Sequence, residues 1–168
     1  ANSMSREAFL ALLNDYFECM AGAVLDGGGE VLRFIGDAVL AIFPVSKDGA
    51  TAAEACAKAE AAVADAVARM DVLNVKRQGF GYPPLGYGIG LHLGDVTYGN
   101  IGTQERIEFT VIGAAANEAA RIESMCKTLG VSVLASDQVV EHLSGGWHSM
   151  GAQELRGVSD KIEVFTPD

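Results

Sequence analysis

The sequence predicts an α+β fold in which helices pack on one face of a mostly antiparallel sheet. Segments with helical spacing of apolar residues alternate with short β-rich runs, and neighbouring runs are joined by hairpin-type turns. The chain has 168 residues, 49% of them hydrophobic, which is enough to build one core. Because no change of composition marks a boundary, we expect a single domain over 1–168 with a ferredoxin-like topology.

A long amphipathic helix is expected at the start of the chain. Ser5 can cap its first turn, Glu7 is an acidic residue near the helix start, and the glycines at 27–29 end the helix. Its apolar residues recur at helical spacing: Phe9, Leu10, Leu13, Phe17, Met20 and Val24.

Two β-rich runs, 30–35 and 38–43, follow this helix with only Gly36 and Asp37 between them. Such spacing predicts a hairpin with a two-residue turn, a conformation that glycine and aspartate tolerate. At the tip of the hairpin, the Asp37 carboxylate could hold a hard cation against a phosphate group. A turn-forming role alone is the other interpretation of Asp37.

The middle of the chain is expected to form a helix and two strands. The alanine-rich segment 49–70 has few helix breakers and predicts a helix packed closely on the sheet. A Gly/Pro loop over 78–84 comes next. We then expect strands over 85–92 and 96–99, joined near Gly94 and Asp95.

The last third of the chain is expected to begin with a projecting ribbon over 100–113, followed by a helix over 114–129. Asn117 and Arg121 lie four residues apart in this helix, hence on one of its faces. There they could offer an amide and a planar guanidinium fork to one ligand, and a solvated helix face is the alternative. The remaining expected elements are a strand at 131–134, a short helix around Val139, and strands near Leu155 and at 162–165.

Charge and cysteine content exclude several classes of partner. The net charge of −10 disfavours nucleic acid and anionic lipid. Cys19, Cys56 and Cys126 are odd in number and widely spaced, which predicts neither a disulfide framework nor a zinc site and fits a reducing cytosol. No uninterrupted apolar run approaches about 20 residues, and no signal peptide opens the chain, so we expect a cytoplasmic segment without membrane contact.

Several runs of the sequence together resemble the catalytic domain of class III adenylyl and guanylyl cyclases. The match covers nearly the whole chain in the right order, and the part most similar to bacterial members lies in 90–113. That part contains Gly-Asn-Ile-Gly at 99–102 and Phe-Thr-Val-Ile-Gly at 109–113. The other matching runs are 33–43, 117–121 and the closing Leu-Arg-Gly-Val at 155–158.

The resemblance implies a domain that binds ATP or GTP together with two Mg²⁺ or Mn²⁺ ions per active site. The sites of such domains are shared between the chains of a head-to-tail homodimer. Asp37 matches the second of two metal-binding aspartates. The family's first metal-binding aspartate lies on a strand before the opening helix, so we expect 1–168 to lack that strand and to bind metal weakly.

The resemblance also implies roles for five further residues. Arg121 matches the arginine that neutralises charge on the α-phosphoryl group in the transition state, and Asn117 matches the residue that orients the ribose. Arg156 matches a basic position that contacts the terminal phosphates, with an ordinary surface arginine as the alternative. Thr110 matches the base-reading position, where its hydroxyl can accept from the adenine amino group, and a plain strand threonine is the alternative.

Arg33 occupies a position where adenylyl cyclases usually carry lysine and guanylyl cyclases glutamate. Arginine only donates hydrogen bonds, which favours adenine over guanine at this position. The family geometry would send Arg33 and Asp37 to opposite sites of the dimer. We therefore expect an adenylate cyclase that makes 3′,5′-cyclic AMP and pyrophosphate, with a guanylate cyclase, a non-catalytic cyclase-like dimerisation or nucleotide-sensing module, and an unrelated ferredoxin-like regulatory module as the alternatives.

Three kinds of residue are expected to have structural roles only. His92 and Tyr98 lie within predicted strands, His142 and His148 have no metal-ligand spacing, and Cys126 is expected to be a buried, inert thiol. Cyclases of this family often carry sensor or membrane domains upstream. The whole protein could therefore have a different cellular localisation from that expected for this segment.

Overall fold

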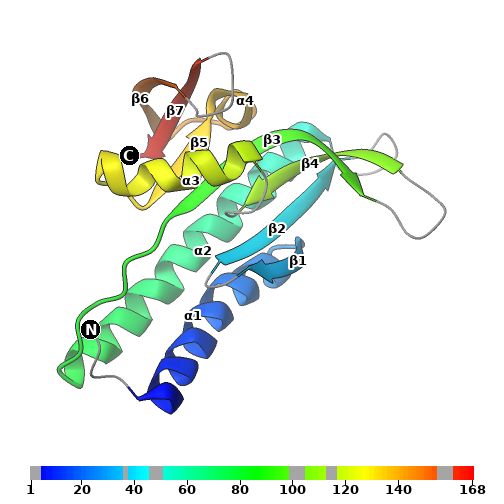
Figure 1. The fold of residues 1–168 in the computed structure, drawn as a ribbon. Coiled ribbons are helices and arrows are strands. Elements are labelled where there is room, and N and C mark those ends of the chain that lie inside the picture. Colours follow the sequence, from blue (N-terminus) through cyan, green and yellow to red (C-terminus); the bar gives the residue numbers. More distant parts are fainter. Residues whose placement is uncertain (1–4, 36–37, 46–50, 99–104, 113–116, 155–160) are drawn as a thin grey trace.

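The computed structural model describes residues 5–35, 38–45, 51–98, 105–112, 117–154 and 161–168. These residues form one seven-stranded sheet, in which the order is β1-β2-β4-β3-β5-β7-β6 (Figure 1). All neighbouring strands are antiparallel except β3 and β5. The strands are β1 (Glu30–Ile35), β2 (Ala38–Val45), β3 (Ile89–Tyr98), β4 (Glu105–Ile112), β5 (Val133–Ser136), β6 (Trp147–Glu154) and β7 (Lys161–Pro167).

The α+β class with a mostly antiparallel sheet is confirmed. Helix α2 (Ala52–Gly79) connects β2 to β3, and these two strands lie on either side of β4. Both are antiparallel to β4 and therefore parallel to each other. A parallel pair joined through a helix, with a third strand inserted between its members, is the split arrangement of ferredoxin-like folds.

Helices cover both faces of the sheet, so the expectation of helices on one face was wrong. Helices α1 (Arg6–Asp26) and α2 pack together on the first face, whereas α3 (Asn117–Leu129) lies on the second (Figure 1). Alternate residues of β5 show the two layers: Val133 and Ala135 belong to the α1/α2 core, and Leu134 packs with Ile122 and Cys126 of α3. The strand period of two residues produces this division.

Helix α1 begins and ends as the sequence predicts. Ser5 is its N-cap, and the Ser5 side chain accepts a hydrogen bond from the backbone N–H of Ala8 at 3.1 Å. Gly27 caps the C-terminus, and Gly28 has φ of 89°, which favours glycine. A side chain at Gly29 would place its Cβ 2.7 Å from the ring of Phe43, so this glycine lets the hairpin approach the core.

The length and composition of α1 meet the criteria for a membrane-spanning helix. By length and composition alone, α1 could cross a membrane, although a core helix or a signal sequence passes the same test. The run of apolar residues is interrupted by Asp15 and Glu18.

The predicted hairpin is confirmed by the pairing of Ile35 with Ala38, and β2 continues two residues beyond the predicted end. Gly36 and Asp37 themselves lie outside the described residues.

Helix α2 is longer than predicted, because it continues to Gly79 instead of ending at residue 70. No proline follows Met70 before the helix ends, and the segment that returns to the sheet is attached to this last part of the helix. The Asn74 side chain accepts from the backbone N–H of Leu85 at 2.7 Å and donates to the Leu85 carbonyl oxygen at 3.2 Å. Both bonds satisfy backbone groups outside the sheet.

The prediction of two strands over 85–92 and 96–99 was wrong. One strand, β3, runs through Gly94 and Asp95, which pair with Phe109 and Glu108 of β4. A partner along this whole length removes the need for a turn at glycine. Strand β4 lies within the ribbon predicted over 100–113, and it projects from the body of the sheet together with β3, which was not predicted to be part of that ribbon (Figure 1).

The elements after α3 follow the predicted order with shifted limits. Strand β5 begins two residues later than expected, and α4 (Asp137–Val140) contains Val139 as expected. Strand β6 ends at Glu154, before the predicted strand position at Leu155, which is outside the described residues. Strand β7 covers the predicted 162–165.

Candidate active site

The candidate site is built around α3, which lies unusually close to β3. A Cβ atom at Gly90 would lie 2.7 Å from the backbone nitrogen of Glu123 and 2.8 Å from the carbonyl oxygen of Ala119. At Gly88 it would lie 2.8 Å from a carboxylate oxygen of Glu123 and 3.3 Å from Cys126 Cβ. Only glycine therefore permits this contact between helix and strand at Gly90.

The next residue of β3 on this face is His92, which is 7% exposed and contacts two other elements. Its Nδ1 atom lies 3.0 Å from the hydroxyl oxygen of Ser136, a fully buried residue of β5. Its Nε2 atom contacts the Glu118 carboxylate in the first turn of α3. An ionised carboxylate only accepts hydrogen bonds, so the imidazole carries a proton on Nε2.

The expectation of a packed His92 is thus confirmed, but the sequence did not reveal its partners. Ser136 lies 44 residues away along the chain. Glu118 is next to Asn117, and nothing in its sequence neighbourhood pairs it with His92. The sequence signal for this contact was a polar residue, His92, that follows Gly88 and Gly90 on one face of a strand.

Two predicted catalytic residues lie on α3. Asn117 is its first residue and Arg121 follows four residues later, as predicted. Arg121 is partly exposed. The Asn117 side chain lies outside what the structure describes.

The other predicted site residues are placed only in part. Arg33 lies on β1 opposite Leu40, and Thr110 lies on β4 between Phe43 and Leu93. Strand β2 separates the strands that carry Arg33 and Thr110. The side chains of both residues lie outside the described part of the structure, as do Asp37 and Arg156 altogether.

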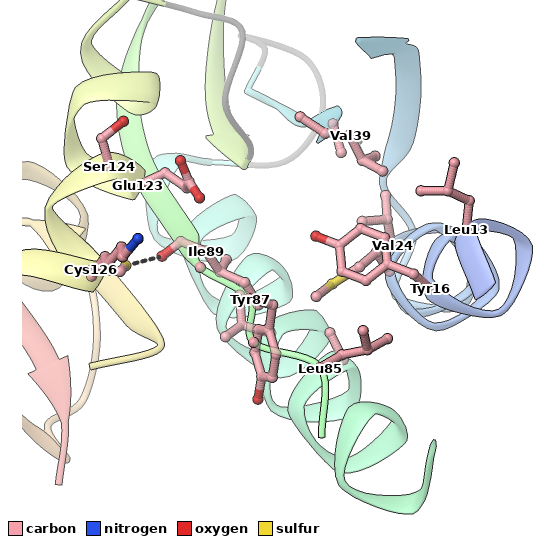
Figure 2. A pocket seen from close by; sticks show the side chains of 18 of the residues that line it. Leu13, Tyr16, Val24, Val39, Leu85, Tyr87, Ile89, Glu123, Ser124 and Cys126 are labelled. Carbon is pink, nitrogen blue, oxygen red and sulfur yellow. Dashed lines mark hydrogen bonds between the residues drawn. The ribbon is translucent and has the colours of Figure 1, made fainter. Parts of the chain in front are cut away.

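A cavity of about 890 Å³ opens beside α3, between the helices and the sheet. Figure 2 shows Leu13, Tyr16 and Val24 of α1 on one side and Glu123, Ser124 and Cys126 of α3 on the other. The remaining lining side chains include Val39, Leu85, Tyr87 and Ile89. Arg121, the predicted site residue whose side chain the structure describes, is not among the lining residues, and the walls are mostly apolar.

Burial controls the titration of two groups at the cavity. Desolvation raises the pKa of the Cys126 thiol to about 11, and the thiol donates a hydrogen bond to the Ile89 carbonyl oxygen. Desolvation also raises the pKa of Tyr87, with a further contribution from Asp71. A thiol that stays protonated at neutral pH is a poor nucleophile, which agrees with the expectation of an inert Cys126.

Within the described residues, no group of three or more His, Cys, Asp or Glu side chains is arranged to hold a metal ion. The described partners of His142 and His148 are Glu141 and Asp168. Asp37, the predicted metal ligand, lies outside those residues.

Comparison with known proteins identifies the family of catalytic domains that the chain is similar to. The family model for the adenylate and guanylate cyclase catalytic domain matches residues 1–166. An adenylate cyclase from Anabaena cylindrica is 38% identical over 133 residues, which are 79% of this chain and 26% of that protein. Adenylate cyclase 1 from Rhizobium meliloti is 29% identical over 163 residues, 96% of this chain and 24% of that protein. The chain thus spans about a quarter of the length of these curated relatives.

Solved structures with the same fold include cyclases of both base specificities. A bacterial light-regulated adenylyl cyclase has a TM-score of 0.72 at 24% identity, covering 99% of this chain and 81% of that one. The guanylyl cyclase Cya2 has a TM-score of 0.70 at 23% identity, and the match covers 97% of this chain and 81% of that one. At such identities the likeness shows the fold alone.

Proposed function

Because the chain belongs to the adenylate and guanylate cyclase catalytic domain family, we propose that it converts ATP to 3′,5′-cyclic AMP and pyrophosphate. The match over residues 1–166 is the observation that carries this proposal. In the reaction, the ribose 3′-oxygen bonds to the α-phosphorus and loses its proton. The bond from that phosphorus to the bridging oxygen of pyrophosphate breaks.

Arg121 and Asn117 are the proposed catalytic residues. Arg121, a partly exposed residue, would neutralise the charge that grows on the α-phosphoryl oxygens, and Asn117 would orient the ribose. Both lie on one helix that is docked on β3 through glycine, which supports a fixed geometry for the pair. Arg156 would contact the terminal phosphates.

Thr110 and Arg33 are the proposed determinants of base choice. The Thr110 hydroxyl would accept a hydrogen bond from the adenine amino group, and Arg33 would donate to a ring acceptor. The two curated relatives are named adenylate cyclases, which supports ATP as the substrate. GTP is the alternative substrate, since a guanylyl cyclase shares the fold.

Class III cyclases are generally dependent on divalent metal ions, and we propose two Mg²⁺ or Mn²⁺ ions per site. When bound, such ions activate the 3′-hydroxyl group and stabilise the triphosphate charge. Asp37 is the residue of this chain proposed to hold them. We also propose a head-to-tail homodimer that shares its sites and a cytosolic position, which is typical of catalytic domains of this family.

The cavity supports the proposal that one more strand, preceding residue 1, completes the domain. The cavity lies against Val39 of β2 and Ile89 of β3, and its walls are mostly apolar. A strand placed against these walls would cover them and bury their apolar surface. A chain that includes the preceding residues should then unfold at a higher temperature than 1–168, and an equal Tm would contradict the proposal.

Product analysis tests the proposed function. The protein, together with its preceding segment, is incubated with ATP or GTP and Mn²⁺, and the products are identified by mass spectrometry. We expect cyclic AMP and pyrophosphate from ATP, and a strong loss of both in Arg121→Ala. A folded, dimeric protein that makes no cyclic product from either nucleotide would instead be a non-catalytic module.

A further inference from the structure

The buried polar contact around His92 connects three elements next to the proposed catalytic helix. His92 belongs to β3, Ser136 ends β5, and Glu118 lies in the first turn of α3. His92 and Ser136 are buried, whereas the Glu118 side chain is 40% exposed. The contact is therefore anchored in the sheet and reaches outward to the helix.

Each polar atom of the imidazole has a partner, so its orientation is fixed. With the proton on Nε2 directed at Glu118, Nδ1 of a neutral ring accepts from the Ser136 hydroxyl group. No buried side-chain nitrogen or oxygen among the described residues lacks a hydrogen-bond partner. Fully satisfied buried networks of this kind make the local structure rigid.

The position of this contact along α3 distinguishes it from ordinary packing. Gly90 fixes how closely α3 approaches β3, since its hydrogen atoms face the backbone of Ala119 and Glu123. Glycine packing alone allows the helix to slide along the strand or rotate about its axis. The contact between His92 and Glu118 removes that freedom at the end of the helix where Asn117 begins it.

We propose that His92, held by Ser136 and paired with Glu118, is a positioning residue that fixes the first turns of α3 and thereby the placement of Asn117 and Arg121. This inference rests on the proposed cyclase function of α3. His92 itself touches no reacting atom in this role. Its contribution is orientation, and misplacement of a catalytic group by about 1 Å can reduce the rate about 10²-fold.

Three variants of the full protein separate positioning from simple packing. His92→Ala removes both contacts. His92→Gln restores them in part, because its amide N–H can donate to Glu118 and its carbonyl oxygen can accept from Ser136. His148→Ala is the matched control, because His148 is an exposed histidine whose partner is Asp168 at the chain end.

Two measurements are made on each variant: hydrogen exchange of the backbone amides in the first two turns of α3, and steady-state kinetics with ATP. For His92→Ala we expect faster exchange in α3, kcat lower by about 10²-fold, and KM within about 3-fold of the parent value. His92→Gln should recover most of kcat, and His148→Ala should match the parent. The double variant His92→Ala/Glu118→Ala should be no slower than His92→Ala alone, since both changes break one contact.

The two readouts keep this inference separable from the proposed function. Unchanged exchange in α3, unchanged kcat in an active protein, or additive losses in the double variant would each overturn the positioning role. If the parent protein forms no cyclic nucleotide, the proposed function is wrong. The proposed contribution of His92 to catalysis is then wrong as well. The exchange measurement then still determines whether His92 orders α3.

Discussion

Replacement of Gly90 by alanine tests how α3 is placed on the sheet. The added Cβ atom would lie 2.7 Å from the backbone nitrogen of Glu123, 2.8 Å from the carbonyl oxygen of Ala119 and 3.0 Å from Glu123 Cα. All three are backbone atoms, so no side chain can rotate out of the way. The helix itself has to move away from β3.

The size of the effect follows from this geometry. An extra methyl group forced into close packing typically costs about 1–3 kcal/mol of stability. In a domain of this size each kcal/mol lowers Tm by about 2–4 °C. We therefore expect Gly90→Ala to unfold roughly 2–12 °C below the parent protein. Because the moving helix carries Asn117 and Arg121, kcat should also fall by about 10²-fold.

Gly94→Ala is the matched control on the same strand. Its Cβ atom would lie 3.8 Å from the ring of His92, which is an ordinary van der Waals contact. Thermal unfolding followed by circular dichroism, together with cyclic nucleotide formation, compares the two variants. Equal Tm values for Gly90→Ala and Gly94→Ala would refute the close contact between α3 and β3.

Further predictions concern other parts of the molecule. Arg121→Ala should lower kcat far more than the affinity for a non-cyclisable ATP analogue, because its partner charge develops in the transition state; equal losses would contradict this role. Mixing Asp37→Ala chains with Arg121→Ala chains should restore activity through one intact site per heterodimer, and no rescue would count against shared sites. Burial raises the pKa of the Cys126 thiol from 9.0 to about 11. The protonated thiol therefore contributes fully to stability below pH 9, and this contribution is lost as the pH rises toward 11. Over this pH range, the free energy of unfolding should fall less steeply in Cys126→Ala than in the parent protein. Glu60→Ala removes the acceptor 2.6 Å from the indole nitrogen of Trp147, the single tryptophan, and should cost about 1 kcal/mol and shift the tryptophan emission; an unchanged spectrum would contradict the contact.

The parts of the fold that were predicted correctly depend on neighbours in the sequence. The Ser5 cap bonds to a residue three positions away, and the hairpin of β1 and β2 closes over two residues. Such local chemistry can be read from the sequence, because both partners lie within a few residues.

The errors occurred where a distant segment supplies the partner. Gly94 appeared to mark a turn, but β4 pairs with β3 on both sides of it. Helix α2 continued past Met70, where Asn74 holds the returning segment at Leu85. The opposite faces of β5 could not be assigned from its short apolar run, since Leu134 is as apolar as its neighbours and yet packs on α3.

In the candidate site, too, contacts with distant segments could not be predicted from the sequence. Asn117 and Arg121 are proposed as site residues from their spacing and the family resemblance, because they are chemically informative side chains. What holds their helix is the absence of a side chain at Gly90 and the contact of Glu118 with His92. The partner that holds His92 in turn is Ser136, 44 residues away along the chain. A glycine in a strand pattern indicates close approach but does not say of what.

The two faces of β3 therefore have different roles in the proposed enzyme. Ile89 and Leu91 face the α1/α2 core, where truncation removes buried apolar area and reduces stability. Gly90 and His92 face α3, where a change alters the position of the catalytic helix as well as its packing. Neighbouring residues of one strand should thus separate into those whose substitution mainly lowers Tm and those that also lower kcat. This alternation arises directly from the two-residue period of a strand whose opposite faces meet different helices.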